Sequence, residues 1–252
     1  MTDDMPKARL EAENKASDVM TEALRFHLDV LGKVDQVFDL ICHLMGPDPM
    51  AWPPSIRVSM NLCCRLMDDL RSVELLCKHG YVVQARVMLT TVIEVACSIA
   101  HIAGNNEMAQ EWIRHNDPER AFMSSRRLIR GVFDRLGIGS HVAEKMESLF
   151  RDAYRWGCQA KHANPVEQRA QRAVYYPNER ALTLIYGPDY SAYGVDDAKD
   201  ALTIAANAAL VALMAIYDHI ADSLDTRSLG ELLALLALDI GCLTPRGEGA
   251  PE

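Results

Sequence analysis

Residues 82–103 would be apolar on nearly every side of a helix, and this stretch limits the possible folds more than any other. Its only charged side chains are Arg86 and Glu94. A helix that is apolar all round is buried among other elements. The sequence therefore predicts a central helix here, ended by the run Gly104-Asn105-Asn106, with further helices packed around it.

A heptad-like stripe of apolar residues predicts a long helix over about residues 8–45. The stripe recurs at steps of about three and four and consists of Met20, Leu24, Leu31, Val34, Phe38, Ile41 and Met45. Such a stripe is typical of a helix that packs along a neighbour, either inside a bundle or across a dimer interface. Similar patterns predict further helices over about residues 55–79, 105–115, 118–136, 140–163, 195–224 and 228–239.

Residues 164–194 differ in composition from the rest, because five of the eight tyrosines lie there. Two short runs rich in tyrosine and aliphatic residues flank Pro177-Asn178-Glu179-Arg180, which predicts a small β-hairpin over about residues 173–187. We therefore expect an all-α fold, a multi-helix bundle with long helices and a late hairpin insertion. It would form one domain over residues 1–243, followed by a flexible Pro/Gly-rich tail at 244–252.

Charge and cysteine content narrow the partners and the compartment. The net charge of −9 makes the chain a poor non-specific nucleic-acid binder, and no DNA partner is predicted. Residues 111–180 are locally basic, with 13 basic and 9 acidic side chains. They could hold a phosphate locally, although a solvated surface rich in arginine is the commoner explanation of such a composition. Seven cysteines without a C-x-x-C pair, and no apolar leader, favour a reducing cytoplasm. The uncharged run 201–217 is slightly short for a membrane span, so no membrane association is predicted.

Glu94 is the first candidate for chemistry. A carboxylate in so apolar a helix needs a partner, since an unpaired buried charge is costly. It could orient a catalytic histidine or hold a cation. A structural ion pair or hydrogen bond is the commoner role for such a group.

Arg155 and His162 form the second candidate site. Seven helical steps place the two side chains on one face, about 10.5 Å apart along the axis. Arginine can stabilise the charge that develops on a phosphorane while histidine transfers a proton. This pair would suit metal-independent RNA cleavage, in which a ribose hydroxyl attacks its own phosphate. The alternative is a surface arginine with a histidine that caps the helix C-terminus.

The sequence predicts neither a metal site nor a cofactor. Pairs of histidine and carboxylate one helical turn apart occur without a third ligand nearby, and Cys97, His101 and Glu94 are interpreted as a core feature. None of the phosphate-binding or nucleophile motifs such as G-x-G-x-x-G, the P-loop or G-x-S-x-G is present.

The chain resembles, over about residues 55–225, a bacterial all-helical family catalogued only as a domain of unknown function. That family shows a helix ending in glycine, then Ala-x-x-Leu-Leu-Arg-Ser-Leu-x-Glu, then Tyr-x-x-Leu-Ser-x-x-x-His. Here the corresponding positions are Gly80, Ala85, Leu89, Thr90, Thr91, Val92 and Glu94, then Tyr154, Gly157, Cys158 and His162. Thr90 replaces the family's arginine, so Glu94 needs another partner, and Arg86, Arg155 and His162 are the candidates.

A weaker resemblance is to HEPN domains, which are helical bundles and include many ribonuclease toxins and phage-defence proteins. Their Arg-x(4–6)-His motif is usually completed at a dimer interface, and Arg155 and His162 match it with six residues between them. A small polar residue often follows the arginine in such motifs, whereas Trp156 stands here.

Three functional interpretations remain, and whether the chain is an enzyme is left open. The first is a HEPN-like endoribonuclease with Arg155, His162 and Glu94 as catalytic residues and with Lys161 and Tyr154 in contact with RNA. The second is a non-catalytic bundle that binds a protein partner or a second copy through the helix at 20–45. The third is a small-molecule pocket around Glu94 and the tyrosine-rich hairpin.

Overall fold

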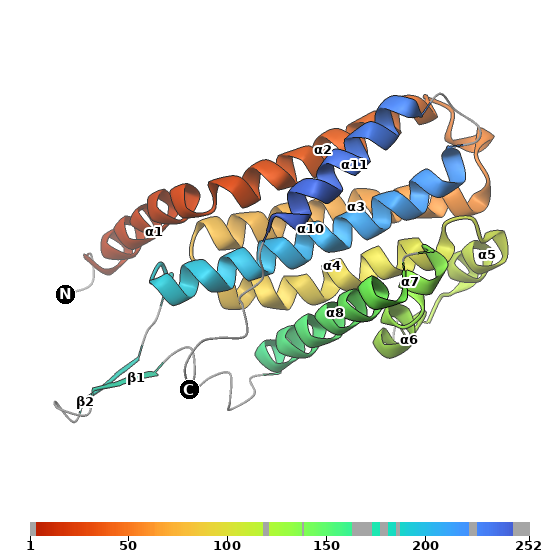
Figure 1. The fold of residues 1–252 in the computed structure, drawn as a ribbon. Helices are drawn as coiled ribbons and strands as arrows, with labels where there is room; N and C mark the ends of the chain where they lie inside the picture. The colour runs from red at the N-terminus through yellow and green to blue at the C-terminus, as the bar shows by residue number, and fades with distance from the viewer. Residues whose placement is uncertain are drawn as a thin grey trace.

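The structure is a computed structural model that describes residues 4–117, 121–137, 139–162, 173–176, 181–184, 187–221 and 226–243. These residues are mostly helical (Figure 1), which confirms the predicted all-α bundle. The helices are α1 (Asp4–Ala23), α2 (Arg25–Met45), the 3-10 turn η1 (Pro49–Ala51), α3 (Pro54–Lys78), α4 (Val82–Ile102), α5 (Asn106–Arg114), α6 (Ser125–Ile129), α7 (Val132–Arg135), α8 (Ser140–Lys161), α10 (Ala192–Ile220) and α11 (Arg227–Gly241).

Local sequence signals explain where several of these helices begin and end. Pro54 occupies the first turn of α3, where its missing N–H costs no hydrogen bond. The side chain of Asn105 caps α5 by accepting a hydrogen bond from the backbone of Met108 (3.0 Å). Ser191 caps α10 in the same way through Gly194 (3.2 Å). The caps fix the ends of helices whose stability comes mainly from packing.

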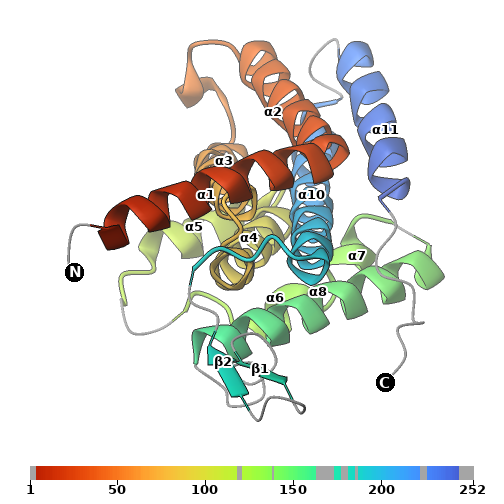
Figure 2. The same cartoon turned by 90° about the vertical axis from the view of Figure 1, so that its left-hand side faces the viewer.

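Helix α4 lies at the centre of the bundle, as its composition predicts. It packs against α3, α10 and α8, and Figure 2 shows α3, α4 and α10 running side by side with α8 crossing beneath them. Even Arg86 is buried along α4, with 3% of its surface exposed. The central position of α4 means that any polar group on it must find its partner on a neighbouring helix.

Helix α2 packs mainly against α10 and α11, near the other end of the chain. Of the heptad-like stripe, which runs from α1 into α2, five residues are buried and the remaining two are partly buried. The stripe therefore packs inside the bundle. An interface through residues 20–45 would have to use the outer surface, where Phe26 is 45% exposed.

Two predicted helices are divided in the structure. The helix expected over 8–45 changes direction at Leu24, whose backbone leaves the helical region (φ −102°, ψ 3°) although its N–H still bonds to the Met20 carbonyl (2.8 Å). No proline or glycine marks this point, so the periodicity predicted one helix. The helix expected over 118–136 is divided into α6 and α7 at Gly131, whose positive φ of 80° breaks the helical path.

Two strands lie in the tyrosine-rich stretch. Residues Ala173–Tyr176 (β1) pair with Ala181–Leu184 (β2) in antiparallel register, with Val174 opposite Thr183. Residues 177–180, which would form the turn, lie outside the described residues, and so does the tail at 244–252. The complete hairpin and the flexible tail stay predictions.

Two helices, α4 and α10, are long and apolar enough to cross a membrane by length and composition. Most of each apolar window is buried against other helices of the bundle. Core helices of globular proteins show the same combination, so this finding is weak evidence for a membrane in either direction. The expected cytoplasmic location stays a prediction.

Candidate functional site

Helix α8 carries most of the predicted site residues, and Gly157 determines how closely it approaches α4. A Cβ atom at Gly157 would lie 2.4 Å from Cγ2 of Thr90 and 2.5 Å from the backbone oxygen of Arg86. Both distances are far below a van der Waals contact, so only glycine permits this crossing. The close approach brings α8 side chains within reach of polar groups on α4.

Glu94 finds its partner across this crossing. The hydroxyl of Tyr154 donates a hydrogen bond of 2.7 Å to Oε1 of Glu94. Burial, and then this hydrogen bond, raise the pKa of Tyr154 to about 12. The partner of Glu94 is thus Tyr154, for which the sequence predicts contact with RNA. It is none of the three predicted partners, Arg86, Arg155 and His162.

Arg86, one of those three, bonds elsewhere. Its guanidinium forms an ion pair with Asp197 of α10 (2.6 Å) and stacks on the indole of Trp156, 3.6 Å from the ring centroid. Three helices therefore meet in one cluster of Asp197, Arg86 and Trp156. The tryptophan that departs from the HEPN pattern has a packing role here, because it covers a buried guanidinium.

Arg155, Lys161 and His162 are all exposed on α8. His162 is the C-cap residue of the helix, and its backbone N–H donates to the Cys158 carbonyl (3.0 Å). The structure thus shows the capping position that the sequence raised as the alternative role of His162, and it leaves the side chain accessible. Residues 163–172, which follow, lie outside the described residues.

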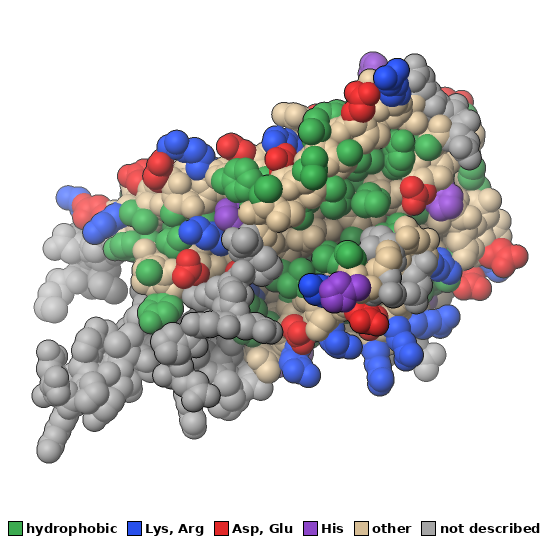
Figure 3. All heavy atoms as spheres, in the orientation of Figure 1, with side chains coloured by type: hydrophobic (Ala, Val, Ile, Leu, Met, Phe, Trp, Pro, Cys, Tyr) green, Lys and Arg blue, Asp and Glu red, His purple; other side chains and the backbone are tan. Residues whose placement is uncertain are grey.

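An arginine-rich groove separates α8 from α6. It has a volume of about 640 Å³ and is lined by Ser125, Arg126, Ile129, Arg130, Glu147, Arg151, Tyr154 and Arg155. All four arginines are exposed, and only Arg151 has a carboxylate nearby in the groove, Glu147 at 3.7 Å. Figure 3 shows basic side chains gathered along the lower edge of the molecule in this region. We call this surface the arginine groove. Its excess of guanidinium groups favours an anionic ligand.

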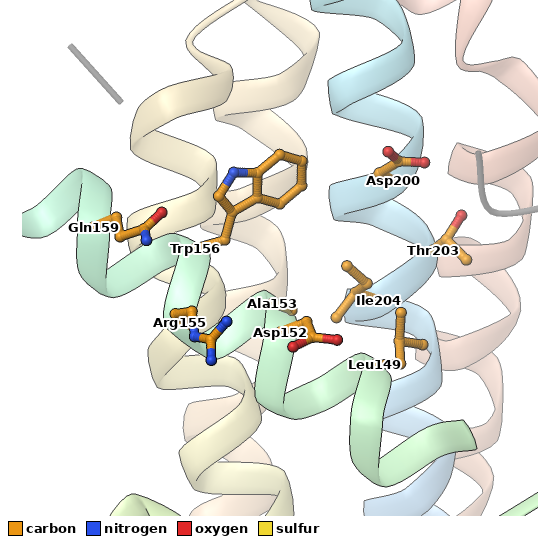
Figure 4. A pocket seen from close by; sticks show the side chains of 9 residues that line it. All are labelled: Leu149, Asp152, Ala153, Arg155, Trp156, Gln159, Asp200, Thr203 and Ile204. Carbon is orange, nitrogen blue, oxygen red and sulfur yellow. The ribbon is translucent and has the colours of Figure 1, made fainter. Parts of the chain in front are cut away.

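A second groove lies on the other flank of α8, against α10 (Figure 4). It has a volume of about 440 Å³ and is lined by Leu149, Asp152, Ala153, Arg155, Trp156, Gln159, Asp200, Thr203 and Ile204. We call it the tryptophan groove. Its walls are mostly apolar, and carboxylates stand on both helices. Arg155 lines both grooves, so the two open on either side of one side chain.

No family model, no curated protein and no solved structure matches the chain. The two family resemblances therefore stay predictions, and the site is interpreted from its own geometry.

No group of three or more histidine, cysteine, aspartate or glutamate side chains within the described ranges is placed to hold a metal ion. All seven cysteines are free thiols. His101, interpreted as a core feature, is buried, and its Nε2–H donates to the Leu128 carbonyl (2.8 Å). The tyrosines Tyr175, Tyr176 and Tyr186 have side chains outside the described residues, and neither Tyr190 nor Glu94 lines either groove.

Sequence reasoning missed the residues that complete the two grooves. Arg126 lies in α6 and Arg130 is the C-cap residue of that helix, in a stretch that the sequence predicts as one longer helix, and Arg151 lies one turn before Arg155. The excess of basic over acidic residues in 111–180 was the sequence signal for the arginines of the arginine groove. It indicated a basic region of the chain but not which side chains form a groove. Nothing in the sequence indicated that Asp197 pairs with Arg86, because only the packing of α10 beside α4 brings the two residues together.

Proposed function

We propose that the chain is a metal-independent endoribonuclease whose site lies on the exposed face of α8, in a reducing compartment. The observation that carries the proposal is the arginine groove, where Arg155 is joined by three further exposed arginines within one concavity of about 640 Å³. Single-stranded RNA is the polyanion that such a groove suits. Its phosphates can follow the guanidinium groups while its unpaired bases turn toward neighbouring surfaces.

The chemistry follows from the residue types along α8. Arg155 would hold the scissile phosphate and stabilise the charge that builds up on it, and Lys161 would add a second positive charge. His162 would take the proton from the ribose 2′-hydroxyl as that oxygen attacks the phosphorus. As the bond from the 2′-oxygen to phosphorus forms, the bond from phosphorus to the 5′-oxygen would break, and that oxygen would take a proton from water, giving a 2′,3′-cyclic phosphate and a 5′-hydroxyl end. No metal ion is needed in this scheme.

Glu94 takes a positioning role in this proposal. Its hydrogen bond to Tyr154 ties the outer helix to α4, and Tyr154 lines the arginine groove next to Arg155. Glu94 itself does not line the groove. We therefore expect it to act on RNA through the position of Tyr154 rather than by direct contact.

The test is cleavage of end-labelled RNA in the presence of EDTA. Wild-type protein is expected to cut, with the rate reduced about 10²- to 10⁴-fold in Arg155→Ala and His162→Ala. His141→Ala is the matched control, because His141 is also exposed on α8, at its opposite end. The HEPN resemblance further predicts that the specific activity rises with protein concentration as two such faces pair.

Two outcomes would contradict the proposal. One is cleavage that persists in His162→Ala at the wild-type rate, which would place the activity elsewhere or in a contaminant. The other is RNA binding without cleavage by any variant, which would leave the arginine groove as a binding surface of a non-catalytic bundle.

A further inference from the structure

The tryptophan groove has the chemistry of a binding site for a flat heterocycle. Leu149, Ala153 and Ile204 give it apolar walls, and the indole of Trp156 adds an aromatic one. Figure 4 shows these side chains gathered between α8 and α10. Pockets that bind small ligands commonly combine such walls with a few polar groups that set orientation.

The aromatic wall is held in place before any ligand arrives. Arg86 stacks on Trp156 and is itself tied to Asp197 on α10. Because Arg86 is 3% exposed, this arrangement sits in the core rather than on a mobile surface. A ligand therefore meets an indole whose orientation has already been fixed, which lowers the entropic cost of binding.

The two carboxylates of the groove favour ligands that present N–H donors. Asp152 and Asp200 contribute carboxylates, which accept hydrogen bonds and repel phosphate, and Gln159 contributes an amide that can both donate and accept. On the opposite flank of α8 the arginine groove has the reverse preference. Arg155 stands at the boundary, so a phosphate bound there has a basic surface on one side and the tryptophan groove on the other.

We propose that the tryptophan groove binds a nucleobase of the RNA whose phosphate lies at Arg155, and that it prefers guanine. Guanine presents two adjacent N–H donors on its Watson–Crick edge, which match one carboxylate in a bidentate arrangement. Uracil has no exocyclic amino group and offers only one N–H on that edge. The inference rests on the proposed RNA function, and it adds a base preference to it.

The experiment uses nucleosides, which lack phosphate and so do not need the arginine groove. Isothermal titration of the full-length His162→Ala protein with guanosine is expected to show binding, with uridine binding about 10- to 100-fold more weakly. Asp152→Ala should lower the affinity for guanosine by a similar factor, and Gln159→Ala should lower it less. Both residues lie at the groove surface, so their variants are expected to fold. Glu144→Ala, an exposed carboxylate elsewhere on α8, is the control.

Different results would overturn the proposed base site and the proposed nuclease activity. Guanosine binding that depends on Asp152, in a protein that never cuts RNA, would support the base site and overturn the cleavage proposal. Equal affinity for guanosine and uridine, no guanosine binding at millimolar concentration, or guanosine binding unchanged in both groove variants would overturn the base site, even if RNA is cut. Binding of long-chain fatty acids instead of nucleosides would overturn it as well.

Discussion

The side of α8 that faces α4 is tightly packed, and we call it the closed side. The two flanks that face α6 and α10 border grooves, and we call them the open flanks. On the closed side, Gly157 leaves no room for one added methyl group, and Tyr154 is bonded to Glu94. On the open flanks, two grooves of about 640 and 440 Å³ expose arginines in one and carboxylates in the other. One helix thus packs closely against α4 and leaves a groove against each of the other two neighbours.

The difference distinguishes residues that stabilise the fold around the site from residues that are expected to contact a ligand. Substitutions on the closed side are expected to change the free energy of unfolding, because well-packed interiors tolerate little change in volume. Substitutions on the open flanks are expected to leave stability nearly unchanged and to alter ligand binding. This contrast can be tested from the closed side outward.

The largest effect is expected for Gly157→Ala. Its Cβ would press against Thr90 and the Arg86 backbone, so α8 must move away, at a cost of about 2–3 kcal/mol despite the better helix propensity of alanine. Urea unfolding followed by circular dichroism measures this. Gly32→Ala in α2 is the matched control, because a Cβ there meets nothing within 4 Å, and it should stabilise by about 0.5–1 kcal/mol. Equal effects of the two substitutions would contradict the close crossing.

Loss of the hydrogen bond between Tyr154 and Glu94 should have an intermediate effect. Glu94→Ala removes the acceptor from a partly buried hydroxyl, and we expect a loss of about 1–2 kcal/mol in the free energy of unfolding. Glu94→Gln keeps an oxygen acceptor and should lose less than about 1 kcal/mol. If the two variants are equally stable, the carboxylate contributes no hydrogen bond to folding.

The raised pKa of the Tyr154 hydroxyl predicts that the free energy of unfolding depends on pH in the alkaline range. The pKa of Tyr154 is raised from 10.0 to about 12, first by burial and then by Glu94, so the folded state favours the protonated phenol. This contribution is complete below pH 10 and is lost as the pH rises from 10 to 12. Urea midpoints measured between pH 9 and 11.5 should fall more steeply for the wild type than for Tyr154→Phe. Parallel curves would show that Tyr154 titrates normally.

The smallest effect on stability is expected for Arg126→Ala and Arg130→Ala in the arginine groove. Both side chains are exposed, so the free energy of unfolding should change by less than about 0.5 kcal/mol. Binding of single-stranded RNA should weaken in each, and the slope of log affinity against log salt should become shallower by about 0.7 per arginine. Arg227→Ala on α11 is the control, and RNA binding that it weakens equally would indicate non-specific attraction.

The closed side could be predicted only in part from the sequence. The burial of α4 followed from its composition, and the need of Glu94 for a partner followed from the cost of an unpaired charge. The identity of that partner did not follow, because it depends on how closely α8 crosses α4. Gly157 is the residue that sets this distance, and in the sequence it appeared only as a departure from a family pattern.

The grooves on the open flanks were harder to predict, because each groove forms only where α8 lies beside another helix. Arg155 was found through its spacing from His162 on one helix. Arg126 and Asp200 are brought beside it by elements far away in the chain, and no local periodicity encodes that meeting. The division at Gly131 had a similar cause, since a single glycine in an otherwise helical pattern left the prediction of one continuous helix unchanged.

The packing of α2 against α10 and α11 has a consequence for the synthesis of the chain. The apolar face of α2 is synthesised well before the helices that cover it, because α3 to α8 lie between them in the chain. At ordinary translation rates that delay is on the order of ten seconds. During this time the nascent chain presents a hydrophobic helix face to the cell, so a chaperone that shields such faces would be expected to contact α2 first.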